Sequence, residues 1–417
     1  MWSGVEPEPG VFNETYIKVM SDMLDNLEAH GMAAIIDVHQ DVLSSYFCEY
    51  DGAPTWLVDL STSSKKEFPW PLKWDGVEPC PYSRQWGLNY LAESTGAAFQ
   101  DIYDNVNGMR DHFGKFWAKV ASSFKGKKIL GYEIINEPWA GNIYDKPSLL
   151  LPGVAGSTNL QPLYDAISEN IRDEDPEHII FYEPVTWGMI FNGTVTGSGF
   201  THVPGGASHA DKSVLSFHYY CWWYTPDGNF TKLTCDNLFI PKIFNQVKED
   251  VRIMGGAVMM TEWGLGCDPT YGITEQCNPI MDQADESLVS WTDWWWTGPL
   301  MNNWNSNPES IKIYSRTYAQ SVAGKPTKMK FDADSDNKLF TLCYDVNPSI
   351  SQPTEIFANF DIHYPNGVLV QLSGSAAESM SVEVQHSRIL VFYQPKKTSG
   401  DRVNTDMDVC VRVISKI

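Results

Sequence analysis

The feature that most constrains the fold is an apolar run that stops abruptly at polar residues. Residues Ile129–Ile135 have the aliphatic character of a buried strand in a parallel sheet, and Asn136-Glu137-Pro138 follows directly. Proline cannot continue a strand ladder. One such ending also suits a strand that stops in a polar turn, but the run Ala257–Thr261 leads in the same way into Glu262. Two carboxylates at the C-terminal ends of two strands are typical of the catalytic edge of barrel proteins.

Strand-like and helix-like segments alternate as far as Gly324. Apolar strand-like runs lie at about residues 33–41, 129–135, 178–184, 214–220, 257–261 and 288–296. Helical spacing is found at about 16–27, 105–124, 161–172 and 241–254, with a further helix before residue 288 and a last helix that ends near Gly324. The alternation predicts an α/β fold, with a (β/α)8 TIM barrel as the leading choice. We expect one or two further barrel strands to precede Met1, so that this chain lacks them.

Two other regions depart from this pattern. Residues 42 to about 100 are rich in Pro, Trp and Ser and form a long excursion, of a kind that is often functional. Beyond residue 325, short strand-like runs separated by turn residues predict a small β-sandwich with a structural role. The sequence therefore predicts an N-terminally incomplete barrel at residues 1–324 and an all-β sandwich at residues 325–417.

Charge and composition narrow the classes of partner. The formal net charge of −22 argues against nucleic acid or an anionic membrane surface as a partner. No run of 18 apolar residues occurs that would span a bilayer. Aromatic residues make up 13% of the chain, and this surplus suits either rings stacked on sugars or a large apolar groove.

Cysteine usage indicates an oxidising compartment. None of the eight Cys forms a Cys-x-x-Cys pair, so no zinc site is expected, and no other metal is implied. Their even number favours disulfides, for which the candidate pairs are Cys48/Cys80, Cys221/Cys235, Cys267/Cys277 and Cys343/Cys410. Asn-x-Ser/Thr triplets begin at Asn13, Asn192 and Asn229. We therefore expect a secreted or lumenal protein, extracellular or digestive/lysosomal, although the first residues do not resemble a signal peptide.

Two carboxylates at strand ends, many Trp and no metal signature point to glycoside hydrolysis. Glu137 is the candidate acid, and the amide of Asn136 before it can bind the sugar 2-hydroxyl. Glu262 is the candidate nucleophile if configuration is retained. Retention requires carboxyl groups about 5–5.5 Å apart, whereas about 6.5–9.5 Å means inversion. Glu183 also ends a strand but lacks a preceding Asn, so it is the second candidate for the acid.

Four more polar side chains lie in phase at strand ends. His39 and Asp41 share one face of their strand by period-two alternation, and so do His218 and Tyr220. A hydrogen bond from Tyr220 can hold the nucleophile ionised, and His218 can orient the substrate or the acid. His39 and Asp41 can bind sugar hydroxyls. A lone histidine near a strand is more often structural, but four residues in phase favour a binding role. Trp294 can stack on a sugar or fill the core.

These motifs resemble those of glycoside hydrolase family 5 over about residues 1–315. A narrower resemblance, to the endoglycoceramidases, is carried by Trp2–Gly10, Asp37–Asp41, Glu137–Asn142, Leu150–Gly153 and the C-terminal sandwich. That family cleaves the β-glucosidic bond between an oligosaccharide and ceramide with retention of configuration. The resemblance implies no cofactor. It implies a glycosphingolipid partner, ganglioside or neutral glycosylceramide, and contact with a membrane surface only through that lipid.

The resemblance also implies the roles of the site residues. Glu137 is the implied acid/base and Glu262 the implied nucleophile. Around the glucose next to the cleaved bond it implies His39, Asp41, Asn136, His218, Tyr220 and Trp294. The insertion Leu149–Val154, together with Trp222-Trp223, can form an apolar groove for the lipid chains or simply cover the barrel end.

One departure from the family keeps other functions open. The family carries a first barrel segment, with a substrate-contacting lysine, ahead of the motif at Trp2, and this sequence does not. We therefore expect either a longer natural protein or an inactive, truncated product. The alternatives are a family 5 β-glucanase or mannanase that acts on a soluble polysaccharide, and a truncated, non-catalytic glycolipid-binding protein.

Overall fold

The computed structural model describes residues 2–49, 51–73, 86–185, 190–191, 194–195, 197–220, 235–264, 277–294, 301–302, 305–394 and 407–416. It divides into two compact units: Met1–Phe217 with Asn245–Met259, and His218–Phe244 with Met260–Ile417. The main sheet has six strands in the order β1-β2-β3-β6-β7-β8, and β6 and β7 each contribute residues to both units. Among the described residues, no helix is long and apolar enough to cross a membrane.

The strands of this sheet lie where the apolar runs predict them. They are β1 (Ala34–Asp37), β2 (Ile129–Glu133), β3 (Ile179–Tyr182), β6 (Ser213–Tyr219), β7 (Ala257–Trp263) and β8 (Ser290–Trp291). Parallel ladders join β1 to β2, β2 to β3 and β3 to β6, with Tyr132 of β2 between Ile36 and Ile180. The predicted α/β fold with a parallel sheet is confirmed. Because these strands run in the same direction, the segments that follow them meet at one edge of the sheet.

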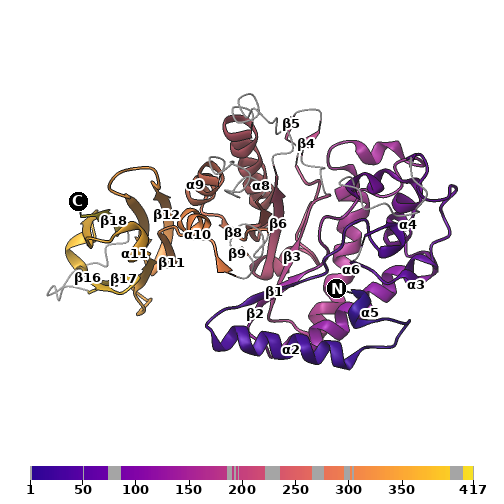
Figure 1. Ribbon diagram of the computed structural model, residues 1–417, viewed down its shortest axis with the longest axis horizontal. Helices are drawn as coiled ribbons and strands as arrows, with labels where there is room; N and C mark the ends of the chain where they lie inside the picture. Colours follow the sequence, from indigo (N-terminus) through magenta and orange to yellow (C-terminus); the bar gives the residue numbers. More distant parts are fainter. Residues whose placement is uncertain are drawn as a thin grey trace. The chain divides into compact units, whose positions relative to one another are not determined.

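The alternating helices also lie close to their predicted positions (Figure 1). They are α2 (Glu14–Ala29), α5 (Met109–Phe124), α6 (Gln161–Glu174) and α8 (Ile240–Met254). On α5, helical spacing brings Phe113, Phe116 and Trp117 to the buried face. The Trp117 indole N–H donates to the carbonyl of Ile134 at 3.1 Å, which fixes the end of the strand just before the Asn-Glu-Pro motif.

The excursion after β1 contains more regular structure than the sequence predicts. Its helices are η1 (Ser45–Phe47), α3 (Thr55–Val58), η2 (Trp86–Leu91) and α4 (Glu93–Tyr103), followed by η3 (Val106–Gly108). Helix α4 carries two buried carboxylates that hold residues 61–66: Asp101 accepts from the Thr62 amide at 2.9 Å, and Glu93 accepts from the Lys66 amide at 3.1 Å. In the insertion, Leu149 is buried, whereas Leu151 is 53% exposed. Trp222-Trp223 lies outside the described residues.

Several short elements complete the first unit and the segments around it. They are α1 (Trp2–Val5), η4 (Pro147–Leu150), η5 (Gly156–Leu160), β4 (Ile190–Phe191), β5 (Thr194–Val195), η6 (Ala207–Lys212) and η7 (Cys235–Phe239), the last of which belongs to the second unit.

In the second unit, the last predicted helix is wrong. After α9 (Cys277–Ser287), β9 (Met301–Asn302) and β10 (Asn305–Ser306), the helix α10 covers only Pro308–Tyr314. The chain then enters β11 (Tyr318–Ser321) and β12 (Gly324–Phe331), which belong to the C-terminal sheets. Lysines at 325, 328 and 330 interrupt β12, so this strand has no apolar run from which it could be predicted. The domain boundary at residues 324/325 stays a prediction.

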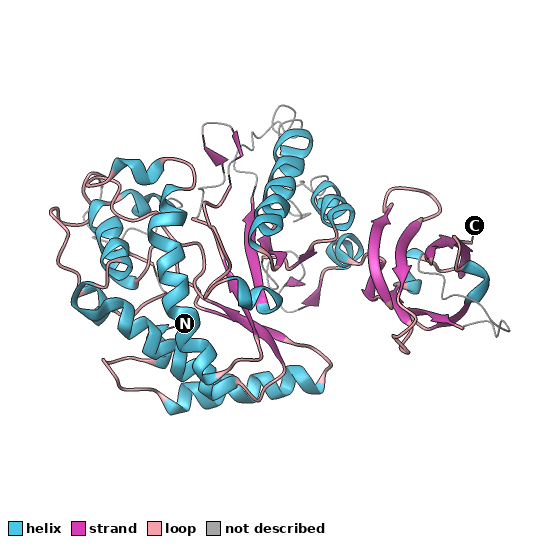
Figure 2. Ribbon diagram, turned by 180° about the vertical axis from the view of Figure 1, so that it is seen from behind, coloured by secondary structure: helices cyan, strands magenta, loops and turns pink. Residues whose placement is uncertain are grey.

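The C-terminal region is a sandwich of two antiparallel sheets (Figure 2). Its other elements are β13 (Phe340–Val346), β14 (Thr354–Phe357), α11 (Phe360–His363), β15 (Val368–Ser373), η10 (Ala377–Ser379), β16 (Met380–Gln385), β17 (Arg388–Tyr393) and β18 (Asp408–Ser415). One sheet has the order β11-β14-β17-β16 and the other β12-β13-β18-β15. Both supply the apolar core, for example Ile389 from β17 and Val411 from β18. The predicted all-β sandwich is confirmed.

One predicted disulfide lies wholly within the described residues. Cys343 of β13 and Cys410 of β18 face each other across the ladder and are bonded. Cys48, Cys235 and Cys277 are also disulfide-bonded, and their predicted partners, Cys80, Cys221 and Cys267, lie outside the described residues. Glycosylation triplets at Asn192 and Asn229 lie outside them as well, whereas Asn13 caps α2 on the surface.

Candidate active site

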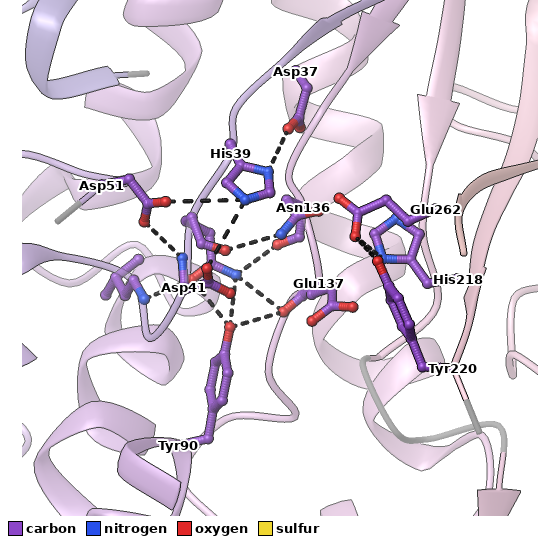
Figure 3. Close-up of polar contacts among 12 residues, drawn as sticks. Asp37, His39, Asp41, Asp51, Tyr90, Asn136, Glu137, His218, Tyr220 and Glu262 are labelled. Carbon is purple, nitrogen blue, oxygen red and sulfur yellow. Dashed lines mark hydrogen bonds and ion pairs between the residues drawn. The ribbon is translucent and has the colours of Figure 1, made fainter. Parts of the chain in front are cut away.

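A polar cluster follows β1 at the edge where the parallel strands end (Figure 3). The Nδ1 atom of His39 lies 3.1 Å from the carboxylate of Asp37. The other ring nitrogen, Nε2, lies 3.9 Å from Asp41 and 4.0 Å from Asp51. Asp37 therefore holds the plane of the ring, with Nδ1 directed at Asp37 and Nε2 directed at the two other carboxylates.

Asp41 lies in a strongly acidic environment. Burial, and then the charge of Asp51, raise the pKa of Asp41 to about 7; His39 opposes this shift and Glu137 adds to it. The amide N–H of Asp41 donates to Asp51 at 2.9 Å, which holds the two residues side by side. A carboxyl that is half protonated near neutral pH can both donate to and accept from a sugar hydroxyl.

Asn136 and Glu137 come to the same cluster from the end of β2. The amide N–H of Asn136 donates to Val38 at 3.1 Å, which continues the β1–β2 ladder beyond the strands. The Asn136 side chain, which is buried, donates to the carbonyl of Gln40 at 3.1 Å. Glu137 has a φ of +40°, in the left-handed region that favours glycine.

Glu183, the second candidate for the acid, is buried behind Glu137. One of its carboxylate oxygens accepts the amide N–H of Glu137 at 3.3 Å. Its main-chain carbonyl accepts from the buried Tyr164 hydroxyl at 2.7 Å. Tyr164 thus anchors the main chain of Glu183, and the Glu183 carboxylate in turn holds the main-chain amide of Glu137.

In the second unit, Glu262 lies on β7 between two donors. The hydroxyl of Tyr220 donates to a Glu262 oxygen at 2.9 Å, and Nδ1 of His218 lies 3.4 Å from the same oxygen (Figure 3). His218 and Tyr220 are alternate residues at the end of β6, and the planes of their rings are perpendicular to each other. Both groups lie at one Glu262 oxygen, where the Tyr220 hydroxyl donates and the His218 ring can donate when its Nδ1 carries a proton.

Trp294 continues the strand next to Glu262. Its amide N–H donates to Trp263 at 2.7 Å, and it bridges to Gly264 in parallel. Because Gly264 is two residues after Glu262, the side chains of Trp294 and Glu262 belong to the same face of the sheet. Trp294 is 39% exposed, whereas Trp263, on the opposite face, is fully buried. This exposure suits a ring that stacks on a ligand rather than one that fills the core.

The structure groups the predicted residues in two sets and adds others that the sequence did not single out. The first unit brings together His39, Asp41, Asn136 and Glu137, and the second brings together His218, Tyr220 and Glu262. The additions are Asp37, Asp51, Gln40 and Tyr90. Asp37 has the same period-two phase as His39 and Asp41, a signal that was available in the sequence. Asp51 and Tyr90 lie in the excursion, where no periodicity marks them.

One group in the first unit has the donor types of a cation site. Ligand atoms of His39, Asp41 and Asp51 all lie within 4.8 Å of one another. The hydrogen bond from the main chain of Asp41 to Asp51 and the ion pairs of the imidazole already account for this proximity.

Comparison with family models gives two matches that cover most of the chain. The model of cellulase (glycosyl hydrolase family 5) matches residues 1–299. The model of the glycoside hydrolase family 5 C-terminal domain matches residues 316–406.

Curated relatives and solved structures agree with these matches. An endoglycoceramidase of Hydra vulgaris is 36% identical over 394 residues, which cover 89% of this chain and 71% of the relative. An endoglycoceramidase of Cyanea nozakii is 33% identical over 427 residues, 97% of this chain and 80% of the relative. Endo-glycoceramidase II from Rhodococcus sp., in its ganglioside GM3 complex, has a TM-score of 0.76 at 21% identity and covers 100% of this chain and 88% of its own. At this identity the structural match describes the fold.

Proposed function

Because the chain belongs to glycoside hydrolase family 5 and to its endoglycoceramidases, we propose that it hydrolyses the β-glucosidic bond between oligosaccharide and ceramide in glycosphingolipids. The products are an intact glycan and free ceramide. Gangliosides and neutral glycosylceramides are the substrates, and the enzyme meets a membrane surface only through them.

The observation that carries the mechanism is the pair of donors on Glu262. Tyr220 and His218 hold this carboxylate ionised and aimed, as a nucleophile requires. Glu262 attacks the anomeric carbon of the glucose and forms a covalent glycosyl-enzyme, while Glu137 protonates the oxygen that leaves with ceramide. In the second step Glu137 takes a proton from water, which attacks the same carbon and restores Glu262, so configuration is retained. This requires carboxyl groups about 5–5.5 Å apart.

The remaining residues bind the sugar ring. His39 and Asp41 offer a donor and a titrating carboxyl for hydroxyls of the glucose next to the cleaved bond. Asn136 is fixed by its bond to Gln40 and faces the 2-hydroxyl, where charge develops in the transition state. Trp294 supplies the exposed ring for stacking.

A secreted or lumenal location, with glycosylation at Asn13, belongs to the same proposal. Asn13 is exposed at the N-terminus of α2, and Cys343–Cys410 is a disulfide of the kind that persists in oxidising compartments.

The first test is the release of glycan and ceramide from a ganglioside in detergent. We expect E262Q to lower kcat by at least about 10⁴-fold, because the nucleophile is lost, and E137Q to lower it by about 10²–10⁴-fold, because acid catalysis contributes that much. Activity of the wild type on a soluble β-glucan or mannan and none on the ganglioside would instead identify a polysaccharide hydrolase. Binding of ganglioside micelles without turnover would identify a glycolipid-binding protein.

A further inference from the structure

We propose that Gln40 is a positioning residue that sets the orientation of Glu137 by holding its main chain. The inference rests on the proposed function, in which Glu137 is the acid/base. Gln40 lies between the predicted sugar-binding residues His39 and Asp41. By strand alternation its side chain points away from theirs, and it is 1% exposed.

The Gln40 carboxamide joins three main-chain groups. Its Nε2 donates to the carbonyl of Asn136 at 2.6 Å and to the carbonyl of Glu137 at 3.0 Å. Its Oε1 accepts the amide N–H of Leu43 at 2.6 Å. The buried hydroxyl of Tyr90 lies 3.2 Å from Nε2 and completes the cluster. The side-chain amide has two N–H bonds, which the two carbonyls satisfy, and an oxygen with two lone pairs, one of which accepts from Leu43.

These bonds are made where the backbone is strained. Glu137 has φ +40°, and Val42 and Leu43 have φ +52° and +73°. Such conformations cost a non-glycine residue roughly 1–3 kcal/mol and persist only where their surroundings impose them. Gln40 bonds main-chain groups of both strained segments, so it couples the turn after β1 to the loop after β2.

Two side chains together fix the Cα–Cβ direction of Glu137. Glu183 accepts the N–H of Glu137, and Gln40 donates to its C=O, so the peptide groups on both sides of Cα are anchored. Acid catalysis needs the carboxyl within hydrogen-bond reach of the glycosidic oxygen, and a misplacement of about 1 Å can cost roughly 100-fold. The direction of this Cα–Cβ bond is therefore the quantity that Gln40 controls.

This role has a kinetic signature. Ceramide leaves as an alkoxide-like oxygen and needs a proton from Glu137. A dinitrophenolate leaving group needs none, because it is already stable as an anion. A defect confined to the placement of Glu137 therefore slows cleavage of the first substrate and spares the second.

The test compares kcat/KM for a ganglioside and for 2,4-dinitrophenyl β-lactoside in wild type, Q40E and Q40M. Q40E keeps an acceptor for Leu43 but, when ionised, has no donor for the two carbonyls; Q40M lacks both. We expect both variants to lose about 100-fold on the ganglioside and less than about threefold on the aryl lactoside, as an E137A reference does. The ratio of the two values on one preparation does not depend on the folded fraction. Q161M, at a buried glutamine of α6, is the matched control and should leave the ratio unchanged.

Three results would overturn the proposal. Equal losses on both substrates would make Gln40 a general structural residue. A Q40E ratio like that of the wild type would mean that the bonds to the two carbonyls do not position Glu137. Inactivity of the wild type on both substrates would remove the proposed function itself, and the role of Gln40 with it.

Discussion

At the scale of single residues, Asp41 makes the stability of the protein depend on pH. Its pKa of about 7 lies above that of an unfolded aspartate, so the folded state binds the proton more tightly. The resulting stabilisation is present below about pH 4 and is lost as the pH rises through about 7. Relative to D41N, which stays neutral, the wild type should lose up to about 4 kcal/mol of unfolding free energy between pH 4 and pH 8.

Chemical denaturation across this pH range checks the prediction. D22N, at an exposed carboxylate paired with Lys18, serves as the control and should track the wild type. A constant difference between D41N and wild type at all pH values would mean that Asp41 is not the titrating group.

The candidate catalytic carboxylates could be predicted from the sequence, but the residues that hold Glu137 in place could not. Glu137 and Glu262 are marked locally, because each follows an apolar strand. The bond from Gln40 to the carbonyl of Glu137 joins residues 97 positions apart, and no local pattern records it. The contact between the Glu183 carboxylate and the Glu137 amide also joins residues far apart in the sequence, so no local pattern indicates it.

At the scale of elements, helix α4 holds the loop before it through buried carboxylates. Asp101, fully buried, accepts from Ser61, Thr62 and Ser63. D101A should lower the unfolding free energy by about 3 kcal/mol, because it leaves several donors without their charged acceptor. It should also speed hydrogen exchange at the amides of residues 62 and 63. D104A, at the exposed end of the same helix, should change stability by less than about 0.5 kcal/mol. Unchanged exchange in D101A would show that the loop is held by other contacts.

Strands with a continuous apolar run were predictable, and elements without one were not. All of residues 129–133 except Leu130 are buried, and their apolar run predicts the strand directly. In contrast, β12 is half exposed and carries lysines, so its pairing with β13 decides its conformation. Helix α4 begins Glu-Ser-Thr-Gly, a sequence with low helix propensity, and tertiary packing of its buried face overrides that preference.

At the scale of the molecule, a buried arginine joins the glycosidase part to the sandwich within the second unit. Arg316 donates to Asp282 at 2.6 Å and to Asp285 at 2.8 Å on α9, and to the carbonyl of Phe331 on β12 at 3.1 Å. R316M should destabilise the protein by about 3–5 kcal/mol, because it leaves Asp285 buried and unpaired. The R316M/D282N/D285N variant removes those charges as well. It should regain much of the unfolding free energy that R316M loses.

Calorimetry tests whether this junction makes α9 and the sandwich unfold together. A single transition in the wild type that moves as a whole in R316M is expected. Two transitions, of which R316M shifts only one, would contradict it. The sequence predicted the two architectures correctly, but it contained no signal for the partners of Arg316, which lie on elements before and after it.

The left-handed backbone at Glu137 has a consequence for the evolution of such proteins. Catalysis requires a glutamate at this position, whereas the positive φ is less strained for glycine. The requirement for activity and the conformational preference of the backbone therefore favour different residues. A change to glycine would abolish acid catalysis and relax the backbone in the same step. Loss of activity is thus conformationally easy at this position, because the substitution that removes the acid also removes the backbone strain.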